Sequence, residues 1–367
     1  MKTLNIFLRG LFLFANLITL ILFILAAYSD RYSPVDNHTM AYLGLAFPIF
    51  CFINFCFILC WLFLKRWYYV LIGIVAFVIC WGPITRYFPF HRKTNPVPQE
   101  NTIKVLSYNV MNFALKKHTP LSPNKIIQYI AQSEADIVCL QEYMAYKNER
   151  GMHEDVIFEA LDMYPYKSVI TLNDVPYRTS GIAVFSKFPI ANSRKLPYNS
   201  KYNGSSIHEI KINNKKLILV NNHLESFGLT GQDRSQYSNL IKSMDSDALE
   251  GIRETFQQKL GPAFIKRAQQ AEMIAEEIRN AKGDYFLVCG DFNDTPISYA
   301  HRTIQGDLLD AFEESGMGMG VTYNQSVFRF RIDNILHSPN IKAYNCTIDK
   351  VNYSDHYPIW SYLQLEE

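Results

Sequence analysis

The pattern of hydrophobic positions divides the chain into an apolar N-terminal part and an alternating remainder. Three long apolar stretches fill most of the first 85 residues, namely Leu11–Ala27, Ala41–Leu64 and Trp67–Ile84. The second is the clearest candidate for a helix that crosses the roughly 30 Å hydrocarbon layer of a bilayer, because it contains one amide, Asn54, and no charge. We therefore predict three transmembrane helices within residues 1–90, with residues 5–85 in contact with the lipid bilayer.

The first apolar stretch follows Lys2 and Arg9, so a cleavable signal peptide is the alternative interpretation. Ala26-Ala27 would be a weak cleavage site, and two further apolar stretches follow it. These observations favour an uncleaved first helix and an integral, multi-pass membrane protein.

The basic pair Lys65-Arg66 links the second and third apolar stretches. Because basic loops stay on the cytoplasmic side of a membrane, this pair predicts that the part of the chain after residue 90 lies on the outer face, periplasmic or extracellular. Arg86, Arg92 and Lys93 oppose this orientation, since they would then lie outside.

From Thr102 onward, short apolar runs of strand length alternate with helical patterns. The predicted strands are Ile103–Tyr108, Asp136–Leu140, Gly181–Phe185, Leu217–Val220 and Tyr285–Cys289. One helix is expected to begin at Ser122-Pro123, an N-cap followed by proline, and another to cover Ala263–Ala281. Asn213-Asn214 fits a hairpin turn.

Two segments fall outside this alternation. Residues 91–101 contain Pro96 and Pro98 and are predicted to be a linker between the membrane segment and the remainder. The polar segment 225–262 is longer than a simple connection requires, and we expect a helical insertion over the site.

The charge balance argues against a protein that grips DNA over a broad surface. The chain has 36 Lys and Arg against 34 Asp and Glu, of which residues 1–85 hold five basic and two acidic side chains. Subtraction leaves 31 basic and 32 acidic residues, a net charge of −1, for the part after residue 85. The seven cysteines show neither a disulfide framework nor a metal-binding CxxC pair.

Polar islands follow the apolar runs of the C-terminal part. They are Ser107-Tyr108-Asn109, Gln141-Glu142, Asn221-Asn222-His223, Asp291-Phe292-Asn293, Ser354-Asp355-His356 and, less marked, Arg331-Ile332-Asp333-Asn334. Each alone is an ordinary turn or cap. Together, carboxylates, amides and imidazoles at the rim of a sheet suit a hard cation, a phosphate or an activated water.

The order of these islands resembles the endonuclease/exonuclease/phosphatase family. The matching motifs are Ser-Tyr-Asn-Val (107–110), Leu-Gln-Glu (140–142), Ser-Gly-Ile-Ala-Val-Phe-Ser-Lys (180–187), Asn-His-Leu (222–224), Gly-Asp-Phe-Asn (290–293), Arg-Ile-Asp (331–333) and Ser-Asp-His (354–356). The resemblance implies a deoxyribonuclease I-like α+β fold for residues 102–367. That fold is a four-layer α/β/β/α sandwich of two packed mixed sheets.

The resemblance also implies a site for a divalent metal. Glu142, with Asn109 nearby and Asp355 as a further contributor, matches the family's metal region. Oxygen ligands favour Mg²⁺ or Mn²⁺ over Zn²⁺.

The remaining motif residues match the family's catalytic groups. Asp291 is expected to activate the attacking water and Asn293 to position water or phosphate. His223 and His356 are expected to meet the phosphate oxygens, with Asp333 orienting His356. Some family nucleases place a glutamate partner for the first histidine where this chain has Arg178-Thr179-Ser180, so the partner of His223 stays open.

The sequence therefore predicts a membrane-anchored, metal-dependent phosphoester hydrolase. Its substrate could be a lipid head group, another small phosphoester or a nucleic acid, and no protein partner is predicted. A membrane-tethered nuclease is the closest alternative. A noncatalytic membrane scaffold would have lost motif residues that this chain retains, and a channel or transporter would rest on the apolar stretches alone.

Overall fold

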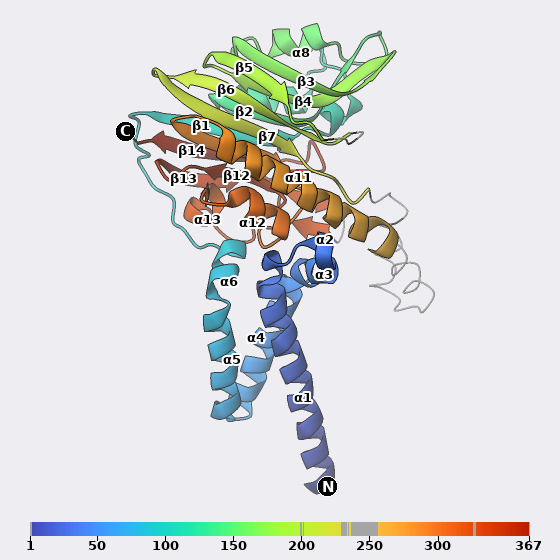
Figure 1. The fold of residues 1–367 in the computed structure, drawn as a ribbon, viewed down its shortest axis with the longest axis vertical. Coiled ribbons are helices and arrows are strands. Elements are labelled where there is room, and N and C mark those ends of the chain that lie inside the picture. Colours follow the sequence, from blue (N-terminus) through green and yellow to red (C-terminus); the bar gives the residue numbers. More distant parts are fainter. Residues whose placement is uncertain are drawn as a thin grey trace.

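A computed structural model describes residues 2–198, 200, 202–228, 233, 235, 256–325 and 328–366. It consists of a helical stalk, residues 2–87, joined to a domain of two packed β-sheets (Figure 1). The N-terminus lies at the end of the stalk that points away from the domain (Figure 1).

The stalk is built from helices that are short except for the first. They are α1 (Lys2–Ala27), η1 (Ser29–Arg31), α2 (Pro34–Asn37), α3 (Thr39–Leu45), α4 (Phe47–Phe63), α5 (Trp67–Ile79) and α6 (Trp81–Tyr87). Within the described residues, Arg9–Ala27 is the one unbroken helix long and apolar enough to cross a membrane. The count rises to three if each of the bent pairs, α3 with α4 and α5 with α6, forms one span.

The predicted continuous helices over Ala41–Leu64 and Trp67–Ile84 are wrong, because each is broken by a proline. The chain bends by 59° between α3 and α4 and by 64° between α5 and α6. A proline lacks the N–H that would bond four residues back and fits the first turn of a new helix. Pro48 accordingly stands at the start of α4, and Pro83 follows the end of α5 by four residues. The carbonyl of Ile79 accepts a hydrogen bond from the Tyr28 hydroxyl instead.

Polar contacts hold α1 against α4. The Asn54 amide nitrogen donates to the carbonyl of Thr19 at 3.0 Å and to that of Phe50 at 2.9 Å. The Trp61 indole nitrogen donates to the Asn16 side chain at 2.8 Å. In an apolar surrounding such hydrogen bonds join helices that the hydrophobic effect alone would not join.

Two mixed sheets form the domain, as the family resemblance implies, and each has six strands. The first has the order β13-β14-β1-β2-β4-β3 and the second the order β5-β6-β7-β8-β12-β9, with one parallel pair in each, β1 with β2 and β7 with β8. The strands are β1 (Thr102–Asn109), β2 (Ile137–Tyr146), β3 (Tyr166–Val175), β4 (Arg178–Ser186), β5 (Ile190–Lys195), β6 (Gly204–Ile212), β7 (Lys215–His223), β8 (Tyr285–Asp291), β9 (Leu309–Asp310), β12 (Asp333–His337), β13 (Ile341–Ile348) and β14 (Ile359–Leu365). A separate hairpin pairs β10 (Tyr323–Gln325) with β11 (Phe328–Phe330).

The sheets pack face to face, and helices cover both outer faces. Val105, Cys139, Leu219 and Leu287 belong to the apolar layer between the sheets. The outer face of the first sheet packs against α7 (Lys125–Gln132) and α8 (Glu154–Ala160). That of the second packs against α11 (Gly261–Asn280) and α12 (Tyr299–Gln305), while α13 (Ala311–Ser315) packs beside β13 (Figure 1). The result is the α/β/β/α arrangement that the family resemblance implies.

The five predicted strands correspond to β1, β2, β4, β7 and β8, and the two predicted helices to α7 and α11. Strand β2 runs on to Tyr146, past its predicted end at Leu140. Helix α7 begins at Lys125 rather than at Ser122-Pro123, because the Asn124 side chain accepts from the backbone N–H of Ile126 at 2.9 Å and so caps the helix. Asn213 and Asn214 turn between β6 and β7 with φ angles of 46° and 64°, as a tight hairpin requires.

The segment between stalk and domain lies along the domain surface. The backbone N–H of His91 donates to the Gly316 carbonyl at 3.1 Å, and Thr94 exchanges two hydrogen bonds with the Asn345 side chain. Of the helical insertion predicted at 225–262, residues 229–232, 234 and 236–255 lie outside the described residues. The described end, Phe256–Leu260, is a turn of π-helix that leads into α11.

Charged side chains join the stalk to the domain. The buried Asp30 carboxylate of η1 lies 3.1 Å from Arg86 of α6 and 3.6 Å from Arg302 of α12. Arg86 also lies 3.7 Å from Glu313 of α13. We call Asp30, Arg86, Arg302 and Glu313 the junction cluster.

Candidate active site

Strand register alone brings three of the predicted residues into a row. In the parallel pairing of β7 with β8, His223 stands opposite Asp291. On the other side of β8, the antiparallel strand β12 places Asp333 opposite the same Asp291. His223 and Asp291 end β7 and β8, whereas Asp333 begins the antiparallel strand β12. All three residues therefore lie at the same end of the second sheet, with the Asp291 carboxylate in the middle of the row.

Asp291 is buried and held from two sides. The Asn109 amide nitrogen donates to its Oδ2 at 3.1 Å, and the backbone N–H of Asn293 donates to its Oδ1 at 2.8 Å. Burial raises the pKa of Asp291 to about 6, and the nearby His356 limits the rise. At neutral pH this carboxylate is ionised, yet it is far more basic than an ordinary aspartate.

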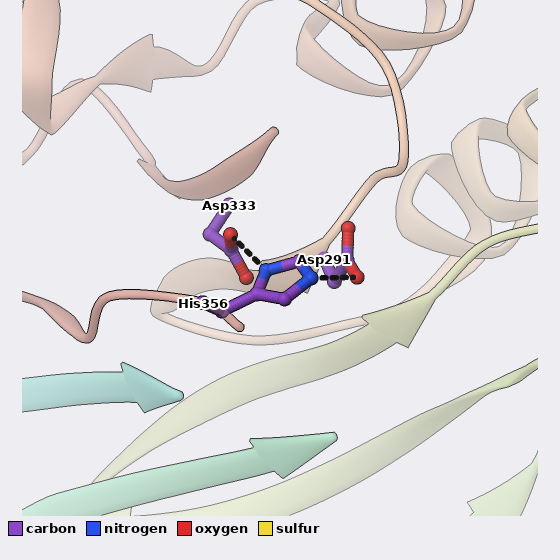
Figure 2. Close-up of side chains that lie close together, drawn as sticks. All are labelled: Asp291, Asp333 and His356. Carbon is purple, nitrogen blue, oxygen red and sulfur yellow. Dashed lines mark hydrogen bonds and ion pairs between the residues drawn. The ribbon is translucent and has the colours of Figure 1, made fainter. Parts of the chain in front are cut away.

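His356 lies between two carboxylates (Figure 2). Its Nδ1 is 2.8 Å from Asp333 Oδ2, and its Nε2 is 3.7 Å from Asp291 Oδ2. Burial would lower the pKa of His356, but the charges of Asp333 and Asp291 outweigh burial and raise it to about 10. The imidazole is therefore positively charged at neutral pH.

His223 differs from His356 in its surroundings. Its Nε2 is 3.8 Å from Asp291 Oδ2 and 3.9 Å from Glu142 Oε1, which are long contacts. Its Nδ1 is buried and has no hydrogen-bond partner among the residues that the structure describes. Burial lowers the pKa of His223, so this ring is neutral where His356 is charged.

The sequence pattern placed Glu142 at the end of a strand. The structure instead places it inside β2, at an irregularity in the strand. The pairing of β2 with β4 shifts between Leu140 and Tyr143, and Glu142 has a φ of 51°. The strand then continues to Tyr146. The bulge turns the Glu142 carboxylate toward Asn109, whose amide nitrogen lies 3.3 Å away.

Sequence reasoning missed Asn112, which also reaches Glu142. Its amide nitrogen lies 3.5 Å from Glu142 Oε2, and its φ of 54° belongs to a left-handed turn after β1. Its position three residues after Asn109 was the only feature of the sequence that could have indicated a place in the site. Burial raises the pKa of Glu142, and the neighbouring Asp355 adds to the rise.

Asn293 and Asp294 are neighbours in sequence but have different hydrogen-bond partners. The Asn293 amide nitrogen donates one of its two hydrogens to the Leu224 carbonyl at 2.9 Å, so the second N–H and the carbonyl oxygen could contact water or phosphate. Asp294 caps its loop by accepting from the backbone N–H of Thr295 at 3.0 Å. It also pairs with the buried guanidinium of Arg267 at 3.1 Å, a partner on α11 that sequence reasoning missed.

A buried polar layer beneath the site joins the two sheets. The Gln141 amide donates to Asn221 Oδ1 at 2.7 Å, across from β2 to β7. The Asn221 amide in turn donates to the carbonyls of Leu140 and Ala183 at 3.2 and 3.1 Å. These bonds fix the two island-bearing strands relative to each other.

A pocket of about 490 Å³ opens over these residues. Its polar lining includes Glu142, His223, Asp291, Asn293, Asp355 and His356. Asn109 and Asp333 are buried behind that lining and contact it. The structure thus brings all eight predicted site residues together, while their roles stay predictions.

Two groups of side chains could hold a metal ion. Asp291, Asp333 and His356 have ligand atoms within 4.8 Å of one another. The set predicted from sequence, Asn109, Glu142 and Asp355, would supply oxygen ligands only; Asn109 lies 3.3 Å from Glu142, and Glu142 and Asp355 both line the pocket.

Comparison with family models gives two matches along the chain. Residues 106–356 match the model described as the Endonuclease/Exonuclease/phosphatase family. Residues 9–87 match a domain of unknown function, DUF8431. No curated protein matches the chain in a sequence search.

Three of the solved structures that are similar to this chain are compared with it by identity, coverage and TM-score. An endonuclease/exonuclease/phosphatase from Beutenbergia cavernae DSM 12333 is 16% identical, with 73% of this chain and 72% of that chain covered and a TM-score of 0.48. D. rerio TDP2 complexed with single strand DNA product is 15% identical, with 72% and 99% covered and a TM-score of 0.47. Sphingomyelinase C from Streptomyces griseocarneus is 17% identical, with 72% and 99% covered and a TM-score of 0.44. All three scores lie below 0.5, so we take nothing about the substrate from them.

Proposed function

The chain belongs to the endonuclease/exonuclease/phosphatase family, and we propose that it is a membrane-anchored phosphoester hydrolase that requires a divalent metal ion. One observation carries the proposal. The buried Asp291 carboxylate, a charged His356 and a neutral His223 meet at one pocket, with Asp333 behind His356. This set supplies both a base and a cation for a phosphate.

In the proposed reaction, Asp291 accepts a proton from the attacking water as the new oxygen–phosphorus bond forms and the ester bond breaks. Its pKa of about 6 makes it a better base than an ordinary aspartate while leaving it ionised at pH 7. Asn109 and the Asn293 backbone fix the carboxylate through its two oxygens. His356 donates a hydrogen bond to a nonbridging phosphate oxygen, where negative charge must be stabilised.

We assign the metal to Asn109, Glu142 and Asp355. Mg²⁺ or Mn²⁺ would neutralise phosphate charge there, and an oxygen-only set suits both ions. Burial and the neighbouring Asp355 raise the pKa of Glu142 although His356 opposes the rise, and a bound cation would stabilise the ionised carboxylate. The alternative group of Asp291, Asp333 and His356 suits a metal less well, because the imidazole already shares a proton with its carboxylates and a ligand must be deprotonated.

We further propose that residues 1–90 anchor the protein in a membrane, with residues 91–101 as the connection and 102–367 as the catalytic domain. The N-terminus and the α4–α5 link that carries Lys65-Arg66 both lie at the end of the stalk remote from the domain (Figure 1). This arrangement supports a domain on the outer face. Arg86 no longer opposes that orientation, because Asp30 and Glu313 balance its charge.

The test is a phosphoester panel applied to the full-length protein in dodecyl maltoside with Mg²⁺. We expect hydrolysis of at least one ester class and a loss of about 10²- to 10⁴-fold in Asp291→Asn. The exposed Asp307 provides a matched control, since Asp307→Asn should retain the parent rate. Equal rates for Asp291→Asn and the parent would refute the assignment and favour a noncatalytic scaffold.

A further inference from the structure

The pocket has a second wall that comes from the stalk. Tyr42 and Leu45 of α3, Ala46 at the bend, and Pro48 and Ile49 of α4 line the same cavity as Asp291 and the two histidines. Four of these five side chains are apolar. A hydrolase that acted only on small polar esters would have no use for such a wall.

The bend between α3 and α4 explains why the wall lies there. Because α4 starts anew at Phe47, the 59° change of direction carries α3 away from the stalk axis and along the domain. The Tyr42 ring packs edge-on against Phe264 of α11, with ring centres 5.4 Å apart. That contact fixes the stalk wall relative to the catalytic wall.

The charge of the pocket indicates a single phosphate. Among the described residues that line it, Arg329 is the one lysine or arginine. A nucleic-acid strand carries a phosphate at each nucleotide and is gripped by several basic side chains. One arginine and the two histidines match one phosphate group.

The size and the opening of the pocket indicate an apolar substituent on that phosphate. A volume of about 490 Å³ is in the range of pockets that enclose whole drug-sized ligands. Met319 lines the pocket and is 43% exposed. Phe90 and Met317, which pair in a β-bridge beside the end of α6, are even more exposed. Exposed apolar side chains next to a candidate membrane span are typical of a surface that faces lipid.

We propose that the substrate is an amphiphilic phosphoester, a lipid, that reaches the pocket from the bilayer. Its phosphate meets His356 and His223, and its hydrocarbon part lies against Leu45, Ala46, Pro48 and Ile49. This inference rests on the proposed function, since it names the substrate of that same site. It makes residues of the membrane segment determinants of specificity.

The test compares p-nitrophenyl phosphodiesters whose second ester group is methyl, butyl or octyl, with the full-length protein in dodecyl maltoside and Mg²⁺. Each CH₂ buried against the wall adds favourable transfer free energy, so we expect kcat/KM to rise at least tenfold from the methyl to the octyl ester. Ile49→Gln should reduce that ratio severalfold, and Ile49→Leu should keep it. Ile74→Gln is the matched control, because Ile74 is an exposed isoleucine of α5 outside the pocket.

A binding measurement without metal separates the two proposals. By isothermal titration, octyl phosphate should bind the parent at least tenfold more tightly than methyl phosphate, and Ile49→Gln should narrow this difference. Hydrolysis without any chain-length preference would overturn the lipid inference but not the proposed phosphoester hydrolysis. Faster cleavage of a single-stranded DNA oligonucleotide than of the octyl ester would have the same consequence. Hydrolysis of no ester would instead refute the proposed function, and the titration would still decide whether the wall prefers an alkyl chain.

Discussion

Asp333 Oδ2 lies 2.8 Å from His356 Nδ1, and both side chains are buried. This contact turns the other ring nitrogen, Nε2, toward Asp291 and the pocket. A carboxylate in that place fixes the orientation of the ring and stabilises its positive charge. Asp333 is therefore a positioning residue that acts through His356.

Replacing Asp333 by Asn should shift the pH dependence of the reaction. His356 is active when protonated, so activity is lost as pH rises through its pKa of about 10. Without the Asp333 charge that pKa falls, and the alkaline limb of the kcat/KM profile should move by more than one pH unit toward neutrality. Asp349→Asn removes a carboxylate that accepts from Tyr129 and Trp360 and does not line the pocket, so it should leave the limb in place. An unmoved limb in Asp333→Asn would contradict the assigned role.

Glu142→Gln should weaken metal binding. The variant keeps the shape of the side chain and removes its charge, so we expect the Mg²⁺ concentration for half-maximal activity to rise at least tenfold. Mn²⁺ binding followed by electron paramagnetic resonance gives a readout independent of turnover. Glu159→Gln changes an exposed glutamate of α8 and should bind Mn²⁺ like the parent. Unaltered Mn²⁺ affinity in Glu142→Gln would remove this residue from the metal site.

Gly290→Ala should disturb both the fold and the site. Gly290 has a φ of 130°, and a Cβ built there would lie 2.0 Å from the Asn222 carbonyl oxygen on β7. The two strands must separate next to His223 and Asp291, so we expect a loss of more than about 1 kcal/mol in stability and a lower kcat. Gly82→Ala is the control, since a Cβ there meets nothing within 4 Å. Thermal unfolding that is the same in both variants would argue against this packing.

Asp30→Asn should loosen the junction cluster. The change leaves Arg86 and Arg302 without their shared carboxylate, and we expect a loss of about 1–2 kcal/mol, less than for a fully buried pair because the arginines are partly exposed. Melting temperature and the rate of proteolysis within residues 91–101 of the full-length protein report the effect. Asp36→Asn, at an exposed position of α2, should change neither. Unchanged proteolysis in Asp30→Asn would show that the cluster does not hold the stalk to the domain.

His208 should make the domain sensitive to acid. It is buried on β6 between Ser193 and Ser206, and burial lowers its pKa to about 4. The unfolded chain, with a histidine pKa near 6.5, binds a proton first, so stability falls as pH drops from about 6.5 to about 4. The loss amounts to about 3 kcal/mol. In His208→Gln the melting temperature should depend less on pH over this window, whereas the exposed His91→Gln should follow the parent.

Much of the site was predictable because the polar islands follow apolar runs and match the ordered motifs of the family. Once β7 and β8 are recognised as neighbours, His223 and Asp291 must meet at their shared end. The position of Glu142 was not predictable in this way, since a bulge with a positive φ at glutamate leaves no signature in its neighbours. The Arg267–Asp294 pair depends on how α11 packs across the second sheet, which no local pattern encodes.

In the stalk, the prediction failed although the local signal was visible in the sequence. Pro48 and Pro83 were visible in the sequence, and the rule that proline breaks a helix predicts both bends. Hydropathy averaged over a long window changes little at a single proline, so the apolar stretches were predicted as continuous helices. The predicted apolar stretches are confirmed as helical, but their continuity is wrong.

The bend at Ala46 has a consequence for how this protein is handled in the laboratory. A soluble fragment that begins after residue 90 would keep every side chain assigned to catalysis and would lose the wall formed by Tyr42, Leu45, Ala46, Pro48 and Ile49. Its pocket would be open on one side to water. If the proposed wall sets the substrate preference, such a fragment would hydrolyse phosphoesters without that preference, so residues 1–90 belong in any preparation used to identify the natural substrate.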